Sequence, residues 1–148
     1  MLIGSYEHAL DAKNRIFIPS KWRECIGDTI ILVQGLLEDR ELSCLFGMSM
    51  NSWESFSQRL SSLPVTDMAG QMIRRRIYAS AASCELDRQG RILLPSALKT
   101  VSGIQKDALL IGVGDRIELW DPMQYNLYNE RMEESYGTAL EHLSLMGV

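Results

Sequence analysis

The stretch LDAKNRIFIPS at residues 10–20 decides the fold, because it returns as LDRQGRILLPS at residues 86–96. The offset is 76 positions, and six of the eleven residues are identical in the two copies. A stretch that repeats at a fixed offset indicates one supersecondary unit used twice. Each copy also places an aspartate and an arginine four residues apart in a turn-like sequence. We therefore expect two matching halves with equivalent contact sites in their loops.

Both copies predict a strand, a tight turn and a second strand that ends at a proline. The four strands are expected at residues 5–10, 15–18, 79–86 and 91–94. Asn14 and Gly90 suit the turns because both residue types tolerate positive φ, and the aspartate before them can bond the backbone two residues on. Pro19 and Pro95 cannot donate to a β-ladder and can each open a short helix. These short helices are expected at residues 21–26 and 97–101.

The rest of each copy predicts a second strand pair followed by a helix. The further strands are expected at residues 29–33, 43–46, 108–113 and 117–120. Asn51, with Glu54 three residues later, resembles a capping box for a helix that Pro64 stops. Asp121, followed by a proline, opens the equivalent helix of the second copy.

The segment between the copies and the end of the chain predict different degrees of order. Asp67 caps a helix that reaches residue 78, whereas residues 137–148 show weak periodicity and no caps, which favours a mobile or loosely helical tail. No long linker separates the copies, so we expect the two halves to share one core. The chain is accordingly divided into a first repeat, connecting helices, a second repeat, and a C-terminal helix with tail: residues 5–50, 51–78, 79–122 and 123–148.

The composition of the 148-residue chain is that of an ordinary globular protein, with 46% hydrophobic and 23% charged residues. No apolar stretch reaches the length of a membrane span and the N-terminus lacks the regions of a secretory signal, so we expect a cytoplasmic protein. Cys25, Cys44 and Cys84 form no Cys-x-x-Cys pair, and the two histidines stand apart. We expect no metal site and three small, buried, reduced cysteines.

The net charge of −4 argues against nucleic acid as a partner, but the charges are unevenly distributed. From Glu118 onward, six acidic residues are accompanied by only one lysine or arginine, Arg131. Cations gather instead around each copy of the repeated stretch and in a run between the copies: Lys13, Arg15, Lys21, Arg23, Arg74, Arg75, Arg76, Arg88, Arg91 and Lys99. The acidity therefore lies largely in the tail, and the repeats carry the positive charge.

The repeated pattern resembles that of the MraZ family of bacterial transcriptional regulators, which belongs to the AbrB/SpoVT-like group. The hallmark is an Asp-x-x-x-Arg motif in each strand–turn–strand–proline unit, here Asp11/Arg15 and Asp87/Arg91. One such motif would be weak, but two in matching contexts are specific. The resemblance covers nearly the whole chain, including the Trp53 helix and residues 117–121. Asn14 is the one departure, since glycine is expected there, and asparagine is a common substitute at positive φ.

This resemblance implies an α+β, β-rich fold: a pseudo-symmetric, swapped-hairpin AbrB-like barrel made from the two repeats and flanked by short helices. It also implies a ring-shaped homo-oligomer that binds double-stranded DNA at repeated boxes upstream of its own operon, in the division and cell-wall gene cluster. We accordingly expect a nucleoid-associated transcription regulator that acts as a repressor. No cofactor, small-molecule substrate or membrane partner is expected.

Arg15 and Arg91 are the principal candidates for DNA contact, because a guanidinium group beside a hairpin loop can fork onto guanine or clamp a phosphate. The alternative is that each arginine only pairs with its own aspartate and pins the loop. Asp11 and Asp87 are expected to support the arginines rather than to contact DNA, because phosphate repels carboxylates. Asn14 and Gly90, which allow the turns, are also expected to have a supporting role. Further phosphate contacts are expected from four cations, with solvated surface charge as a near-equal alternative: Lys13, Lys21, Arg23 and Arg88.

Three questions stay open at the level of sequence. Residues 74–76 can contact DNA or pair with a neighbouring subunit, and the second role is favoured. An enzyme is disfavoured, because no nucleophile–base pair, metal cluster or phosphate-cradling loop is recognisable. A glycine pair at residues 112–114 lacks the further glycine and helix of a dinucleotide fingerprint. A protein-binding module that uses the same barrel is the main alternative, and steep salt dependence of binding to duplex DNA would distinguish it from a DNA-binding protein.

Overall fold

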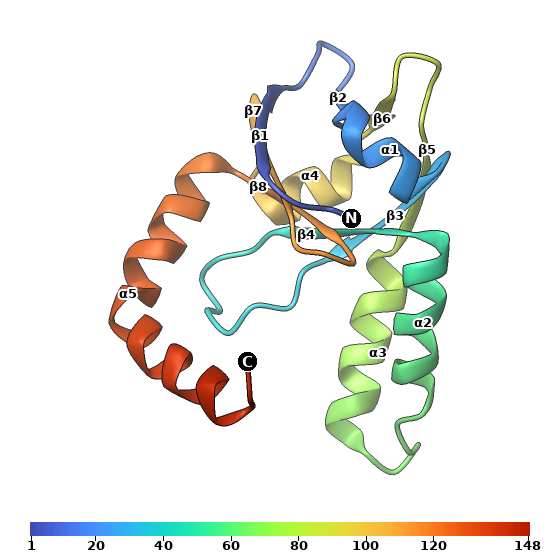
Figure 1. Ribbon diagram of the computed structural model, residues 1–148. Coiled ribbons are helices and arrows are strands. Elements are labelled where there is room, and N and C mark those ends of the chain that lie inside the picture. Colours follow the sequence, from blue (N-terminus) through green and yellow to red (C-terminus); the bar gives the residue numbers. More distant parts are fainter.

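The computed structural model describes all 148 residues, and the two copies of the repeat interleave in it (Figure 1). The first copy contains β1 (Ser5–Ala9), β2 (Arg15–Phe17), α1 (Ser20–Ile26), β3 (Thr29–Gln34), β4 (Leu45–Ser49) and α2 (Met50–Ser61). The second contains β5 (Ala82–Glu85), β6 (Arg91–Leu93), α4 (Ser96–Ser102), β7 (Asp107–Gly112), β8 (Ile117–Trp120) and α5 (Pro122–Leu145). Helix α3 (Met68–Ser80) connects them.

Six strands form an antiparallel main sheet in the order β1-β7-β8-β4-β3-β5. The copies meet at its centre, where β4 pairs with β8. At the margins, the first strand of each copy pairs with a strand of the other copy: β1 with β7, and β5 with β3. The two halves thus exchange their outer strands, which confirms the pseudo-symmetric, β-rich α+β architecture.

The other two strands, β2 and β6, pair with each other and form a separate antiparallel ribbon, here called the β2–β6 ribbon. Ile16 lies opposite Ile92 at its centre, so Arg15 is opposite Leu93 and Phe17 is opposite Arg91. The two copies therefore occupy equivalent positions on either side of the Ile16–Ile92 pair. Because neighbouring strand residues point to opposite faces, the buried isoleucines leave both arginines on the outer face.

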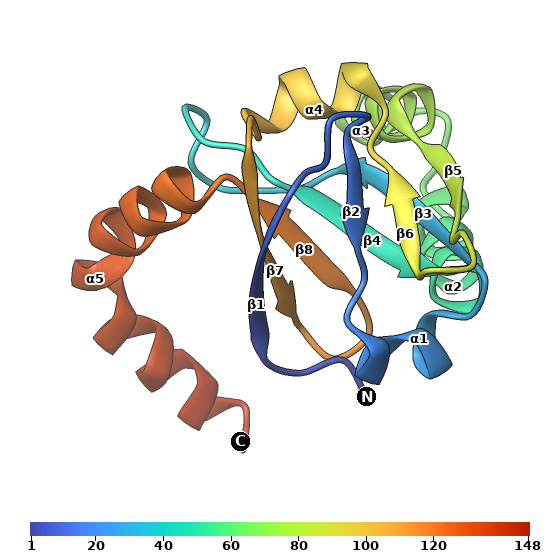
Figure 2. The ribbon, with the colours of Figure 1, turned by 90° about the horizontal axis from the view of Figure 1, so that it is seen from above.

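The main sheet is not closed, so the expectation of a barrel overstates its geometry. Strands β1 and β5 are paired on one side only, and the β2–β6 ribbon lies over the sheet rather than completing it (Figure 2). The reason lies in the hairpins. The Asp11 N–H donates to the Arg15 carbonyl at 3.0 Å and the Asp87 N–H to the Arg91 carbonyl at 2.9 Å. The ladder between the two strands of each hairpin does not extend beyond this pairing.

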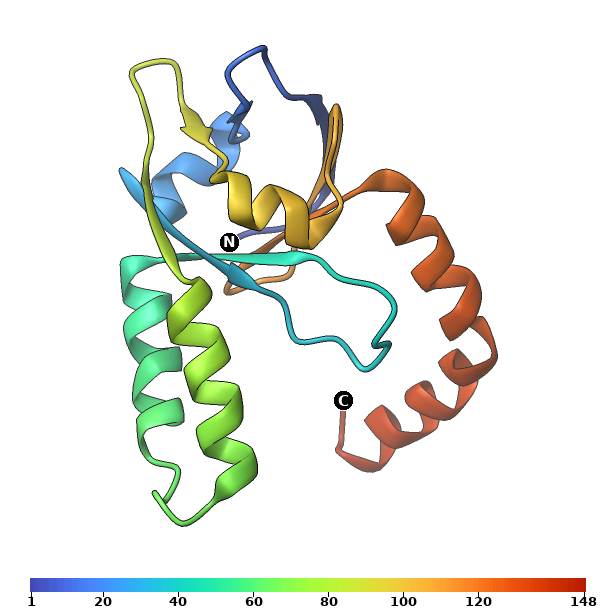
Figure 3. The ribbon, with the colours of Figure 1, turned by 180° about the vertical axis from the view of Figure 1, so that it is seen from behind.

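Hydrophobic side chains from both copies fill the space between the ribbon and the main sheet. This cluster has 17 buried residues and includes Ile16 and Ile92 from the ribbon. A second cluster of eight buried residues, including Ile77 and Trp120, lies where α2, α3 and the start of α5 pack against the sheet. The expectation that the two halves share one core is confirmed. Helices α2 and α3 project from the side of the molecule opposite the hairpin loops (Figures 1 and 3).

Asp67 and Asp121 cap α3 and α5 as expected, but the predicted capping box of α2 is wrong. The N-cap of α2 is Ser49, whose hydroxyl accepts the Ser52 N–H at 3.2 Å. Strand β4 runs into this helix without a loop, so the last residue of the strand takes the capping position before Asn51 is reached.

Two further expectations differ from the structure at exposed positions. The segment from residue 137 is not a loose tail, because α5 continues as regular helix to Leu145. Its weak periodicity reflects lack of burial, since every residue from 133 to 148 is exposed. Cys44 and Cys84 are buried as expected, whereas Cys25 on α1 is exposed. No helix combines the length and the apolar character needed to cross a membrane.

Candidate nucleic-acid interface

The two hairpin turns, loop 1 (residues 11–14) and loop 2 (residues 87–90), share the same internal bonding. In each, the aspartate Oδ1 accepts two backbone N–H groups at 2.9 Å: those of Lys13 and Arg15 for Asp11, and those of Gln89 and Arg91 for Asp87. Asn14 has φ 60° and Gly90 has φ 79°, so both turns close through a left-handed residue as the sequence predicts. The repeated motif therefore encodes two copies of one preformed loop.

The same aspartates hold the arginine side chains. Arg15 Nε donates to Asp11 Oδ2 at 2.7 Å, and Arg91 Nε donates to Asp87 Oδ2 at 2.9 Å. Arg91 Nη1 also lies 3.5 Å from Asp11 Oδ2, so one guanidinium group bridges the two loops. The Arg15 side chain keeps 33% of its surface exposed and that of Arg91 keeps 19%. Each aspartate thus orients an arginine whose side chain remains partly exposed.

Both aspartates are stabilised in their charged form. The N–H of Arg15 is the largest cause that lowers the pKa of Asp11, and the Arg15 guanidinium group lowers it further. Arg91 acts in the same two ways on the pKa of Asp87. At neutral pH each loop therefore contains a charged carboxylate. It neutralises part of the positive charge and holds the arginine side chain in one orientation.

Acid should loosen both loops. Because the folded pKa of each aspartate lies below its ordinary value of 3.8, its stabilising effect is fully present above that value. The effect is lost as the pH falls through the folded pKa. We expect the double variant D11N/D87N to lose less stability than the wild type below about pH 4, measured as the free energy of unfolding in urea. Identical acid dependence of the two proteins would contradict this.

The outer face of the β2–β6 ribbon combines cations with exposed apolar groups. Phe17 is 42% exposed and Leu93 is 58% exposed, and the Arg91 guanidinium carbon lies 5.8 Å from the centre of the Phe17 ring. The major groove of DNA admits a two-stranded ribbon, in which arginine can fork onto guanine and an apolar group can contact the thymine methyl. Phe17 and Leu93 were not predicted as contact residues from the sequence. Their position two residues from an arginine within a strand was the available signal.

Some of the other cations near the ribbon are exposed, and some are hydrogen-bonded to the protein. Lys13 and Arg88 are exposed on the loops themselves, and Lys21 is exposed on α1. Arg23 is half-buried, and its Nε donates to the Ile18 carbonyl at 2.9 Å. Lys99, which was not predicted as a contact residue, donates from Nζ to Asn14 Oδ1 at 2.9 Å. The ribbon and its loops thus bring together most of the expected cations, but not all of them point freely outward.

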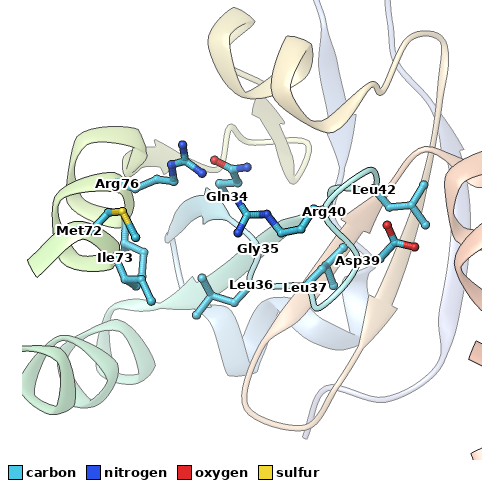
Figure 4. Close-up of a pocket in the computed structure, with 11 residues that line it drawn as sticks. Gln34, Gly35, Leu36, Leu37, Asp39, Arg40, Leu42, Met72, Ile73 and Arg76 are labelled. Carbon is cyan, nitrogen blue, oxygen red and sulfur yellow. The ribbon is translucent and has the colours of Figure 1, made fainter. Parts of the chain in front are cut away.

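The arginine run at residues 74–76 lies elsewhere. It belongs to α3, which packs its Ile77 into the second hydrophobic cluster, away from the ribbon. Arg76 lines a hollow of about 470 Å³ between α3 and the connection of β3 to β4, and Figure 4 shows Arg76 and Arg40 reaching toward Gln34 there. Most of the other side chains that line this hollow are apolar. No three His, Cys, Asp or Glu side chains gather in a way that could hold a metal ion.

Known proteins resemble the chain over its full length and in both halves. The family model described as "MraZ protein, putative antitoxin-like" matches residues 1–76 and again residues 77–145. The Transcriptional regulator MraZ of Acetivibrio thermocellus is 38% identical over 148 residues, which is 100% of both chains. That of Caldanaerobacter subterraneus subsp. tengcongensis is 38% identical over 97% of this chain and 96% of its own. That of Caldicellulosiruptor bescii is 44% identical over 81% and 80%, respectively.

Proposed function

Because this chain belongs to the MraZ family, we propose that it is a transcription regulator that binds double-stranded DNA through the β2–β6 ribbon and its two hairpin loops. The observation that carries this proposal is the pair of aspartate-oriented guanidinium groups, Arg15 and Arg91, at equivalent positions on one exposed ribbon. Donors that are already oriented lose less conformational entropy when they meet a base edge. The ribbon therefore supplies two preformed forks related by pseudo-twofold symmetry.

The other residues of the surface have distinct parts in this proposal. Asp11 and Asp87 orient the arginines and do not contact DNA. Lys13, Lys21 and Arg88 are exposed and contact phosphates, which fix the register of the ribbon on the duplex. The exposed side chains of Phe17 and Leu93, which lie opposite the two arginines in the ribbon, contact thymine methyl groups.

The DNA sites are repeated boxes upstream of the protein's own operon, in the division and cell-wall gene cluster, and binding there represses transcription. The protein acts in the cytoplasm at the nucleoid. The names of the relatives support the regulatory role, because they are called transcriptional regulators. The boxes, the operon and the repression are what the resemblance to the family implies.

The assembly is a ring-shaped homo-oligomer. Tyr136, Leu140 and Leu143 lie within two turns of one another on an exposed face of α5 and are accompanied by acidic residues. On α3, Met72 and Ile73 are exposed beside the hollow that contains the guanidinium groups of Arg40 and Arg76. Neither apolar face has a partner within the chain. The hollow is lined by two arginines and one aspartate, Asp39, so it carries a net positive charge opposite to that of the acidic residues on α5. A neighbouring copy can bury both, which agrees with a structural role for residues 74–76.

A protein-binding module is the second candidate, and the exposure of Phe17 and Leu93 favours it. Apolar side chains on a ribbon can dock another protein as well as a thymine methyl. The two functions differ in their dependence on salt, because phosphate contacts release counterions and protein docking through apolar groups does not.

The proposed function predicts a steep salt dependence. In a band-shift titration, a duplex from upstream of the protein's own gene should bind more tightly than a scrambled duplex at the same salt concentration. The logarithm of the affinity should fall with that of the salt concentration, with a slope of about −0.9 per phosphate contact. Equal affinity for both duplexes would contradict sequence recognition, and a flat salt response would favour the protein-binding module.

A further inference from the structure

Each hairpin loop is contacted by a cation from the other repeat, here called its brace. In loop 1, Lys99 of α4 bonds the Asn14 side chain. In loop 2, Arg23 of α1 covers Gly90 so closely that an added Cβ would lie 2.1 Å from the Arg23 guanidinium carbon. Figure 2 shows α4 beside the end of loop 1 and α1 on the side of loop 2. Both loops are therefore held across the boundary between the copies.

The two braces are equivalent in position but different in chemistry. Arg23 and Lys99 are separated by the repeat offset of 76, as are Asn14 and Gly90. Where the turn residue has a side chain, the brace is a lysine, whose ammonium group bonds the amide oxygen. Where the turn residue is glycine, the brace is an arginine that lies against the glycine backbone. The Nε of this arginine donates to the Ile18 carbonyl. Each turn residue is thus matched to its own brace.

We propose that Arg23 and Lys99 are positioning residues that hold loops 2 and 1 in register with each other, and that neither contacts DNA. Both are half-buried, and both lie on the short helices beside the loops rather than on the outer face of the ribbon. Arg23 Nε donates to the Ile18 carbonyl, and Lys99 Nζ donates to the Asn14 side chain. With the bridge from Arg91 to Asp11, the braces tie the two arginine-bearing loops into one unit. The consequence for DNA rests on the proposed function. The brace itself is a property of the free protein.

Exchange of the matched pairs tests the brace. We expect K99M and N14G each to weaken binding to the upstream duplex about fivefold, the size of one hydrogen bond. We expect G90N to weaken it at least as much, because the added side chain would overlap the Arg23 guanidinium group. The paired variants R23K/G90N and N14G/K99R rebuild in each loop the pair found in the other. They should bind within about twofold of the wild type, the scatter of independent changes. Paired variants as weak as their single variants would overturn the proposal.

Amide hydrogen exchange, measured in the absence of DNA, tests the brace independently of the proposed function. The Asn14 and Gly90 amides bond the Asp11 and Asp87 carbonyls and report the closure of each loop. K99M should speed exchange at Asn14 but not at Gly90, and R23M should do the reverse. Arg59→Met, a charge-matched change on α2, should affect neither. If the loops respond but no variant binds DNA specifically, the brace stands and the proposed function fails.

Salt dependence distinguishes positioning from phosphate contact. K99M and R23M should lower affinity while leaving the salt slope unchanged, because no counterion release is lost. If either variant instead reduced the slope by about 0.9 and left the amide exchange unchanged, that cation would be a phosphate contact and the proposal would be wrong.

Discussion

The double variant R15A/R91A is expected to lose specific binding to the upstream duplex while it keeps its fold and assembly. One bidentate contact to a base contributes about 1–3 kcal/mol, and two are removed from every chain. Both side chains lie on the outer face of the ribbon, and the aspartates keep their bonds to the loop backbone, so the buried core is untouched. Band-shift titration measures the loss, and circular dichroism verifies the fold.

The single variants Asp11→Ala and Arg15→Ala test the alternative that the arginines only pin their loops. In that case Asp11→Ala and Arg15→Ala should lower the melting temperature equally, and DNA affinity should change only as much as stability does. We expect affinity to fall much further than stability for Arg15→Ala. The control is Arg59→Ala, which removes the same charge from α2 and should leave DNA binding unchanged.

A duplex with two correctly spaced boxes should bind far more tightly than a duplex with one. Linked sites on one assembly turn the second contact into an intramolecular step, with a gain of about 10²–10⁴ in affinity. Leu140→Asp puts a charge on the apolar face of α5 and should remove the gain. Thr138→Asp adds the same charge to the opposite side of the helix and should retain it.

Light scattering of the free protein completes this test. The wild type and the Thr138 variant should be oligomers at micromolar concentration, and the Leu140 variant should be smaller. A wild-type monomer, or equal affinity for one and two boxes, would contradict the assembly.

The local features of the functional surface follow from sequence because they depend on residues close together in the chain. An aspartate three positions before a left-handed residue specifies the whole loop, and the structure has it twice. The caps at Asp67 and Asp121 are equally local. In each case the side chain bonds a backbone group within four residues, so no knowledge of the tertiary fold is needed.

The features that sequence reasoning missed depend on contacts between distant segments. The bonds from Lys99 to Asn14 and from Arg91 to Asp11 form only because β2 pairs with β6. Patterning predicts each strand but not its partner, so the open edges of the main sheet could not be predicted. The end of α5 was missed for the opposite reason: apolar periodicity reports burial, and this part of the helix has no partner within the chain.

The most direct test of the central claim is the affinity ratio between the upstream duplex and a scrambled duplex for the variant R15K/R91K. Lysine keeps the charge that attracts phosphate but lacks the planar fork that recognises guanine. We expect binding to the scrambled duplex to survive at the same salt concentration and the ratio to fall toward one. A ratio as high as that of the wild type would show that the two arginines do not read the DNA sequence.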